Sequence, residues 1–173
     1  DEMSEQPKST GGGNVHEWGP LVDDLAQRRT KALGMGGEQF VERQISLGKL
    51  TVRHRLEFLL DPGTWVEYGM LANHMDSGLG DRFLAADGAV TGIGEIDGRP
   101  VAVAAYDFSV MAGSMGAVGE NKIRRMRHHA ISQRIPMVWL LDSAGARIQA
   151  TSGSTFAGAG DLFREQVAMS GVV

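Results

Sequence analysis

The segment Met137–Gln149 (MVWLLDSAGARIQ) carries the clearest chemical signal in the chain. Its first half is mostly apolar, which is typical of a buried strand, and it opens after Asp142 into the small residues of Ser143–Ala146. Small side chains let a ligand reach the main chain, whose free N–H groups can stabilise a negative charge that develops on an oxygen. The same composition also suits a tight turn that binds no ligand. On composition alone, both interpretations remain open.

A second candidate is the Gly-rich segment Ala112–Lys122 (AGSMGAVGENK). A phosphate-binding P-loop requires a lysine directly after its last glycine, whereas Glu120 and Asn121 intervene here. A Rossmann fingerprint requires two glycines one residue apart, and this segment has no such pair. Two interpretations remain: the glycines allow close packing where a strand enters a helix, or they shape one wall of a ligand site. The second interpretation uses Gly113, Ser114, Met115 and Gly116.

The helix expected over about Val118–Gln133 carries several cations in a chain whose net charge is −4. Ile123, Met126 and Ala130 give it an inward apolar stripe, and its arginines lie largely elsewhere on the helical wheel. These cations either cover a solvated face or form a patch for ligand phosphates or an acidic partner. The candidate cofactor contacts are Arg124, Arg125 and Arg127 on this helix, together with Arg147 after the small-residue loop. Nucleic acid is not expected as a partner, because no aromatic platform accompanies the patch.

Other catalytic classes find little support in the residues. His128 and His129 are adjacent, so on a helix they point roughly 100° apart and cannot easily share a metal ion. Ser114 and Ser143 lie outside the G-x-S-x-G pattern of an acyl-serine nucleophile. The chain has no cysteine, which removes disulfides and thiolate nucleophiles. We therefore expect neither a metal site nor a covalent serine mechanism.

The elements that position these residues follow an α/β order. Residues 1–18 are polar and contain Gly, Ser and Pro, and we expect a flexible tail there. Residues 19–63 are expected to be helical, with helices over Leu21–Leu33 and Glu38–Gln44 and a third after Thr51, a candidate N-cap. Residues 64–173 alternate between the two periods: a strand near Trp65, two strands joined by Asp97-Gly98, the basic helix, the strand Met137–Leu141 and a helix over about Ala159–Ser170.

Composition and length set further bounds. A length of 173 residues, with 42% hydrophobic and 22% charged residues, suits one soluble globular domain or most of one. No apolar run approaches the roughly 20 residues that a membrane helix needs, and the first residues do not resemble a signal peptide. These features and the lack of cysteine fit a cytoplasmic protein that binds no membrane. Because the sequence has no initial Met and ends on apolar residues, we expect it to be part of a longer protein.

Three separated blocks resemble one known family. Gln44–Gly69, Tyr106–Met126 and Pro136–Gln149 are similar in order and spacing to the carboxyltransferase (β) subunit of biotin-dependent acyl-CoA carboxylases, of the propionyl-CoA carboxylase type. The likeness covers nearly everything after about residue 20 and is more specific than any single Gly motif. It implies a crotonase-like ββα spiral, in which residues 64–173 form the first part of the N-terminal carboxyltransferase domain.

The resemblance also implies a reaction. A carboxyl group passes from carboxybiotin to the α-carbon of an acyl-CoA thioester through an enolate. Ala144, Gly145 and Ala146 occupy the position of the backbone amides that hold the enolate oxygen, with Gly145 as the strongest candidate. Many relatives have Gly-Gly where this chain has a single glycine. The resemblance implies no side-chain base and no metal, because biotin itself supplies the base.

The implied assembly is larger than this chain. Biotin is carried by a partner, the biotin carboxylase and biotin carrier subunit, and the carboxyltransferase forms homo-oligomers based on dimers, with a hexamer as the expected form. A second oxyanion segment and the biotin-facing domain would lie beyond Val173, so the fragment alone is expected to be inactive. Two alternatives remain open: a biotin-dependent acyl-CoA decarboxylase subunit, and a non-catalytic CoA-binding or assembly subunit.

Overall fold

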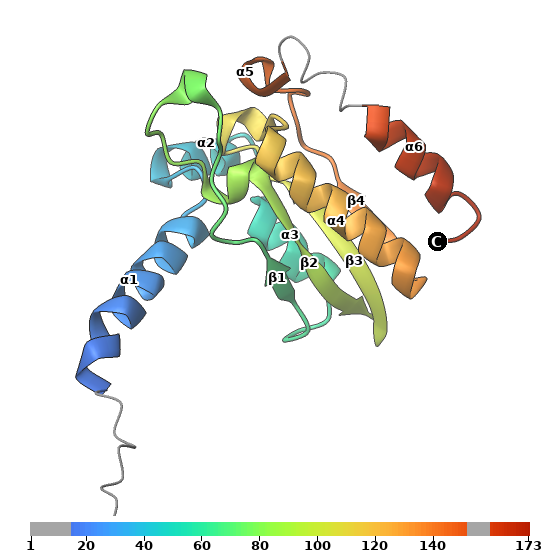
Figure 1. Cartoon of the computed structure of the whole chain (residues 1–173), viewed down its shortest axis with the longest axis horizontal. Helices are drawn as coiled ribbons and strands as arrows, with labels where there is room; N and C mark the ends of the chain where they lie inside the picture. The colour runs from blue at the N-terminus through green and yellow to red at the C-terminus, as the bar shows by residue number, and fades with distance from the viewer. Residues whose placement is uncertain (1–14, 152–159) are drawn as a thin grey trace, which may run out of the picture.

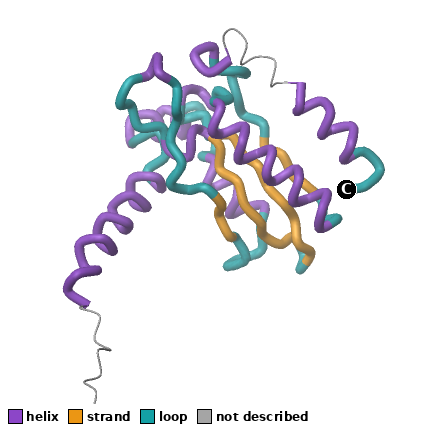
Figure 2. The backbone as a smooth tube through the Cα atoms, viewed as in Figure 1, coloured by secondary structure: helices purple, strands orange, loops and turns teal. Residues whose placement is uncertain are grey.

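A four-stranded sheet with the strand order β1-β2-β3-β4 lies at the centre of the molecule (Figure 1). The computed structural model describes residues 15–151 and 160–173. β1 (Val66–Tyr68), β2 (Ala89–Ile96) and β3 (Arg99–Tyr106) pair in antiparallel fashion, and β4 (Met137–Leu140) joins β3 in parallel. Helix α4 (Ala117–Gln133) makes the crossover between β3 and β4, as a parallel pair requires. Figure 2 shows the strands as one continuous sheet beside this helix.

The hairpin between β2 and β3 has the turn that the sequence predicts. Asp97 and Gly98 both have positive φ, 51° and 70°, which is the backbone of a type I′ turn. The Asp61 carboxylate accepts hydrogen bonds from both of their N–H groups, at 3.2 and 2.8 Å. The paired register runs from Ile96↔Arg99 at the turn to Ala89↔Tyr106 at the far end. The prediction of two strands joined at Asp97-Gly98 is therefore confirmed.

The sheet is covered on both faces, which explains the apolar sequence of β3. Alternate residues Val101, Val103 and Ala105 pack with Val52, Leu56 and Leu60 of the α3 (Val52–Leu59) region. Ala104 and Tyr106, which alternate with these residues, pack with Ile123 of α4. Figure 1 shows α3 behind the sheet and α4 in front of it. Residues Val101–Tyr106 are buried, as a strand covered on both faces requires.

The helices before the sheet are α1 (Val15–Leu33), α2 (Glu38–Ser46) and α3. The Thr51 hydroxyl accepts a hydrogen bond from the His54 N–H at 3.3 Å, which confirms its role as an N-cap. Helix α1 begins at Val15, inside the predicted tail of residues 1–18, and residues 1–14 lie outside the described residues. The helix runs through Gly19 and Pro20, two residue types that disfavour a helix interior and therefore concealed its start.

The remaining elements are short or terminal. A single 3₁₀ turn covers Ser77–Leu79, and α5 (Ile148–Thr151) is a short helix after β4. Ala85–Gly88 and Met111–Gly113 are tight turns that contain residues with positive φ. Helix α6 (Gly160–Met169) lies beside α4, close to the range predicted for the last helix. Within residues 15–151 and 160–173, no helix combines the length and apolar character needed to cross a bilayer.

Candidate active site

The loop after β4 lies against the Gly-rich segment, so the structure brings together the two segments that the sequence singled out. The Ala144 N–H donates to the Ala112 carbonyl, the Met115 N–H donates to the Gly145 carbonyl, and the Arg147 N–H donates to the Met115 carbonyl, each at 2.9 Å. Met115 and Ala146 thus form a parallel β-bridge. The loop after β4 is held along its length by main-chain bonds to the Gly-rich segment.

The three predicted amide donors differ in their present partners. The Ala144 N–H is engaged by Ala112. The Gly145 N–H donates to the hydroxyl of Ser143 at 3.0 Å, and Ser143 is an exposed residue whose side chain can rotate away. The Ala146 N–H makes no hydrogen bond to the described residues, because the bridge uses the groups on either side of it. Gly145 and Ala146 therefore remain the candidates for the main-chain donor role.

The loop needs glycine at position 145. Its φ is +101°, a conformation that side-chain-bearing residues rarely adopt, and an added Cβ would meet nothing within 4 Å. The requirement is conformational, since space is available. Ala144 and Ala146 do not have a positive φ, so alanine is compatible with the backbone at both positions.

The glycines of the Gly-rich segment allow close packing behind the loop. A Cβ at Gly113 would overlap the Asp142 carbonyl, and one at Gly116 would overlap the Arg147 guanidinium. A Cβ at Gly119 would lie 2.8 Å from the Asp87 carbonyl oxygen, closer than real contacts allow. The close-packing interpretation of these glycines accounts for all three positions. The segment therefore forms the wall on which the small-residue loop rests.

Arg147, a predicted cofactor contact, lies inside the protein. It is 2% exposed, and its Nη1 lies 3.0 Å from an Asp76 carboxylate oxygen and 2.5 Å from one of Asp87. Its Nε donates to the Ser114 hydroxyl at 3.2 Å and its Nη2 to the Ser114 carbonyl at 3.0 Å. Asp76 and Asp87 were not predicted as site residues, because nothing in their local sequence separates them from surface aspartates.

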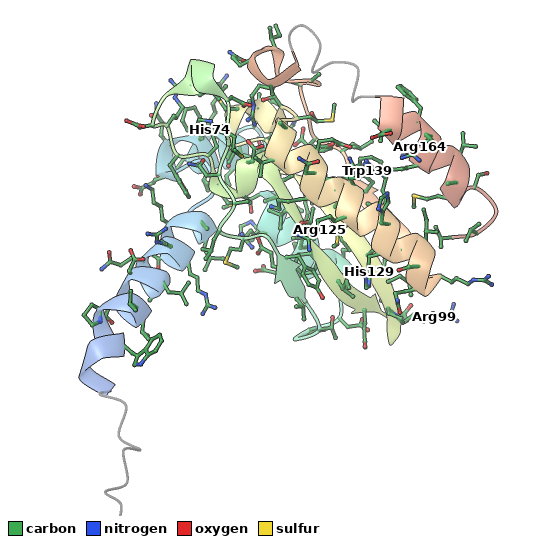
Figure 3. All side chains as sticks on the ribbon, in the orientation of Figure 1. His74, Arg99, Arg125, His129, Trp139 and Arg164 are labelled. Atoms are coloured by element: carbon green, nitrogen blue, oxygen red, sulfur yellow. The ribbon has the colours of Figure 1, made fainter. Side chains whose placement is uncertain are left out.

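The basic helix α4 divides its arginines between burial and solvent. Arg127 is 0% exposed, and it donates to Glu165 of α6 at 2.5 Å and to Glu120 at 2.6 Å. The expectation that its arginines lie off the buried side is therefore wrong for Arg127, whose partner Glu165 comes 38 residues later. Arg124 lies 3.6 Å from carboxylates of α6, while Arg125 is exposed on the side of α4 away from α6 (Figure 3). Of the predicted α4 contacts, Arg124 and Arg125 remain accessible to a ligand.

A cavity of about 620 Å³ adjoins the Gly-rich segment. One of its lining residues is Ala112, whose carbonyl accepts the hydrogen bond from Ala144 in the loop Ser143–Ala146, the candidate donor loop. Its aromatic and cationic lining residues come from α2 and from the two segments that precede the Gly-rich run; they are Phe40, Arg43, Arg82, Phe83 and Phe108. Lys31 lies over the Phe83 ring at 4.3 Å and Lys49 over the Phe108 ring at 4.6 Å. The cavity is therefore both aromatic and positively charged, which suits a planar ring that carries phosphates.

Asp142, the residue before the donor loop, is hydrogen-bonded to Gln44 of α2 and to Lys49. The Asp142 carboxylate accepts hydrogen bonds from Gln44 and from Lys49, each at 3.1 Å. Gln44 also lines the cavity. Sequence reasoning did not find these cavity residues, because they come from three separate segments and only the fold brings them together.

Two buried ionisable groups lie behind the site. The Lys122 ammonium donates to the carbonyls of Ala86 and Ala89, at 3.0 and 2.5 Å, and burial lowers the pKa of this group from 10.5 to about 8. Burial raises the pKa of the Asp107 carboxyl, against the opposing effect of two hydrogen bonds from Ser109. Among the described residues, no group of three or more His, Cys, Asp or Glu side chains is arranged to hold a metal ion.

Fold and site together define a mixed α/β domain in which β4 is followed by a small-residue loop beside a cationic cavity. The family model of the carboxyl transferase domain matches residues 43–173 of the chain. The chain therefore belongs to the carboxyl transferase domain family, as its sequence blocks indicated.

Similar proteins agree with this assignment. The chain is 41% identical over 154 residues to the carboxyltransferase subunit of propionyl-CoA carboxylase from Haloferax mediterranei, covering 88% of this chain and 30% of that protein. It is 42% identical over 154 residues to the methylmalonyl-CoA carboxyltransferase 12S subunit from Propionibacterium freudenreichii subsp. shermanii, covering 88% and 29%. The chain thus spans about 30% of the length of these relatives.

A solved structure supports the fold as well as the family. Transcarboxylase 12S, a hexamer with methylmalonyl-CoA and methylmalonic acid bound, matches with a TM-score of 0.83 at 40% identity. The match covers 88% of this chain and 30% of that chain. The predicted family and the predicted crotonase-like α/β fold class are confirmed.

Proposed function

We propose that the full-length protein is the carboxyltransferase component of a biotin-dependent acyl-CoA carboxylase. The proposal rests on one observation above all: in a chain about 40% identical to such subunits, the loop after β4 leaves the Ala146 N–H unpaired among the described residues. The reaction joins a carboxyl group to the α-carbon of an acyl-CoA. Biotin, on a partner carrier protein, supplies the carboxyl group and the base, and we assign none of the described residues to hold it.

The role proposed for the loop is to stabilise an enolate. Loss of the α-proton places negative charge on the thioester oxygen, and the N–H groups of Gly145 and Ala146 would donate to that oxygen. Gly145 becomes available when the exposed Ser143 hydroxyl rotates away. Each such donor stabilises a transition state by about 2.7–4 kcal/mol, or about 10²–10³ in rate. The bridge to Met115 supports this role, because it fixes the donors before the substrate binds.

The cationic cavity is the proposed site for the CoA portion of the substrate. Its volume of about 620 Å³ falls in the usual range for small-molecule sites. Arg43 and Arg82 would meet the phosphates, and Phe83 or Phe108 would stack on the adenine ring. The exposed arginines Arg124 and Arg125 of α4 form the other surface that phosphates could reach. Gly113, Ser114, Met115 and Gly116 would contribute the wall between the cavity and the loop.

The experiment uses the full-length subunit with its biotin carboxylase and biotin carrier partners. We expect ATP-dependent incorporation of labelled bicarbonate into a short acyl-CoA such as propionyl-CoA. Sodium-dependent decarboxylation of the carboxylated product without ATP use would instead favour a decarboxylase subunit. Acyl-CoA binding without either activity would favour a non-catalytic subunit. The absence of acyl-CoA binding to the assembled protein would contradict the proposal altogether. The oligomer, a hexamer by analogy with transcarboxylase 12S, is measured in the same sample by light scattering.

A further inference from the structure

We propose that Arg147 is a positioning residue that sets the place of the Gly145 and Ala146 amide donors, and that Asp76 and Asp87 hold it. The inference rests on the proposed function, since it assigns these side chains a role in the same reaction. It differs from a ligand contact, because Arg147 would act on the substrate only through the main chain of the loop.

The first support is the burial of a complete ionic cluster. The side chains of Arg147, Asp76 and Asp87 are 1%, 4% and 0% exposed, and both carboxylates contact the same guanidinium nitrogen. Lys122 lies beside this cluster and donates to the carbonyls of Ala86 and Ala89, on either side of Asp87. Buried charges are stable only when they are paired in good geometry, so the cluster strongly fixes the guanidinium.

The second support is that Arg147, which follows Ala146 of the bridge, is hydrogen-bonded to Ser114 and Met115 on the opposite strand of the bridge. Its main-chain N–H donates to the Met115 carbonyl, and its guanidinium donates to the carbonyl and hydroxyl of Ser114. Arg147 therefore contacts Ser114 through its side chain and Met115 through its main chain, in addition to the bond from the Met115 N–H to the Gly145 carbonyl. A shift of the guanidinium would move the N–H of Ala146, because Ala146 directly precedes Arg147 in the chain.

The third support is the geometry of Asp87 and Gly116. The second carboxylate oxygen of Asp87 accepts a hydrogen bond from the Gly119 N–H at 2.7 Å, in the first turn of α4. Asp87 therefore links the donor loop, through Arg147, to the start of the crossover helix. Gly116 lies where any Cβ would overlap both Arg147 and Asp87, so the chain leaves room for this contact. Asp87 itself has φ +52°, an unusual value for a residue other than glycine.

A positioning role and a purely structural one differ in measurable ways. We compare full-length Arg147→Lys with Arg53→Lys, a control in a partly buried arginine pair on α3, in which Arg53 lies 2.6 Å from Glu67. Lysine keeps the charge and loses the fork that reaches two carboxylates and Ser114 together. We expect Arg147→Lys to lower kcat about 10²-fold with KM for acyl-CoA within about twofold, as when one amide donor is lost. Arg53→Lys should lower thermal stability and leave kcat per folded molecule unchanged.

Hydrogen exchange supplies a readout that does not depend on activity. In Arg147→Lys, amides of a peptide spanning residues 141–147 should exchange faster than in the wild type, while those of β3 should be unchanged. If Arg147→Lys fails to fold, Asp76→Asn replaces it with the same two readouts, because Asn keeps the volume and removes the charge. Equal kcat in the Arg147 and Arg53 variants, with unaltered exchange at residues 141–147, would overturn the positioning role. An inactive wild type would instead reject the proposed function, and the exchange comparison would then decide on positioning alone.

Discussion

Met115 and Ala146, 31 residues apart in the sequence, face each other in a parallel β-bridge. Both main-chain groups of Met115 are used in it, since its N–H donates to Gly145 and its carbonyl accepts from Arg147, each at 2.9 Å. In such a bridge the main-chain groups of Ala146 itself point to the other side. The contact that fixes the loop therefore also leaves one donor available, which connects the packing of the Gly-rich segment to the proposed chemistry.

Replacing Gly145 with alanine should lower activity through the backbone. The φ of +101° at Gly145 costs a side-chain-bearing residue about 1–2 kcal/mol, and relaxation of this strain would turn the N–H away from the substrate. We expect kcat of the full-length enzyme to fall at least about tenfold with KM little changed. Gly98→Ala is the matched control, because Gly98 has φ +70° and open space but lies in the β2–β3 turn. Equal kcat values in the two variants would count against the donor role.

Charge reversal in the cavity should weaken acyl-CoA binding. Arg82→Glu and Arg43→Glu each replace an attraction for phosphate by a repulsion, and we expect the Kd for acyl-CoA to rise about tenfold or more at low salt. The effect should shrink at high salt because exposed charges are screened. Isothermal titration of the full-length protein measures it. Arg125→Glu tests the α4 surface, and Arg99→Glu, on the β2–β3 hairpin, is the control (Figure 3). If only Arg125→Glu weakens binding, the phosphates bind at α4 and the cavity assignment is wrong.

Glu165 should be a main determinant of how α6 is held on α4. Its buried carboxylate lies 2.5 Å from Arg127, 2.9 Å from His128 and 3.6 Å from Arg124. Removing one partner of a buried pair leaves an uncompensated charge and costs about 3–5 kcal/mol. We therefore expect Glu165→Ala to lower the free energy of unfolding by an amount of this order in urea denaturation. Gln166→Ala, at the next and exposed position, should change it by less than about 0.5 kcal/mol. Similar effects from both variants would show that the ion cluster contributes little.

Lys122 should make stability depend on alkaline pH. Burial lowers the pKa of its ammonium from 10.5 to about 8, so between these values the folded protein binds fewer protons than the unfolded chain. The free energy of unfolding should then rise with pH over the window from about 8 to 10.5. Below about 8, where Lys122 is charged in both states, the cost of burying the ammonium is complete and this pH dependence ends. The comparison is wild type against Lys122→Met, with the exposed Lys31→Met as control. If the free energy of unfolding depends on pH in the same way in the wild type and in Lys122→Met, the lowered pKa of Lys122 is contradicted.

Local patterns predicted most of the fold. The Asp97-Gly98 dipeptide located the hairpin, Thr51 located the start of α3, and the stripe of Ile123, Met126 and Ala130 located the buried side of α4. These features depend on neighbours within a few residues, so one sequence contains the information. The predicted strand at Met137 and the loop after it also lie where the sequence placed them.

Long-range pairing could not be predicted in the same way. Nothing in the local sequence distinguishes Arg127 and Arg147 from surface arginines. Their partners, Glu165 for Arg127 and Asp76 and Asp87 for Arg147, are brought to them only by the fold. The cavity beside the loop has the same origin, since its cations Arg43 and Arg82 are brought together from separate segments. Sequence reasoning therefore named the loop proposed to carry the main-chain donors, and it missed the carboxylate partners of Arg127 and Arg147 and the cations of the cavity.

The most direct test of the donor role is a structure of the full-length subunit with a nitronate analogue of an acyl-CoA. The nitronate oxygens stand in for the enolate oxygen, which carries the charge that the donors are proposed to stabilise. We predict one such oxygen about 2.7–3.1 Å from the Ala146 nitrogen, with Gly145 released from Ser143 and donating as well. A nitronate bound elsewhere, or with its oxygens beyond hydrogen-bond distance of both amides, would contradict the account.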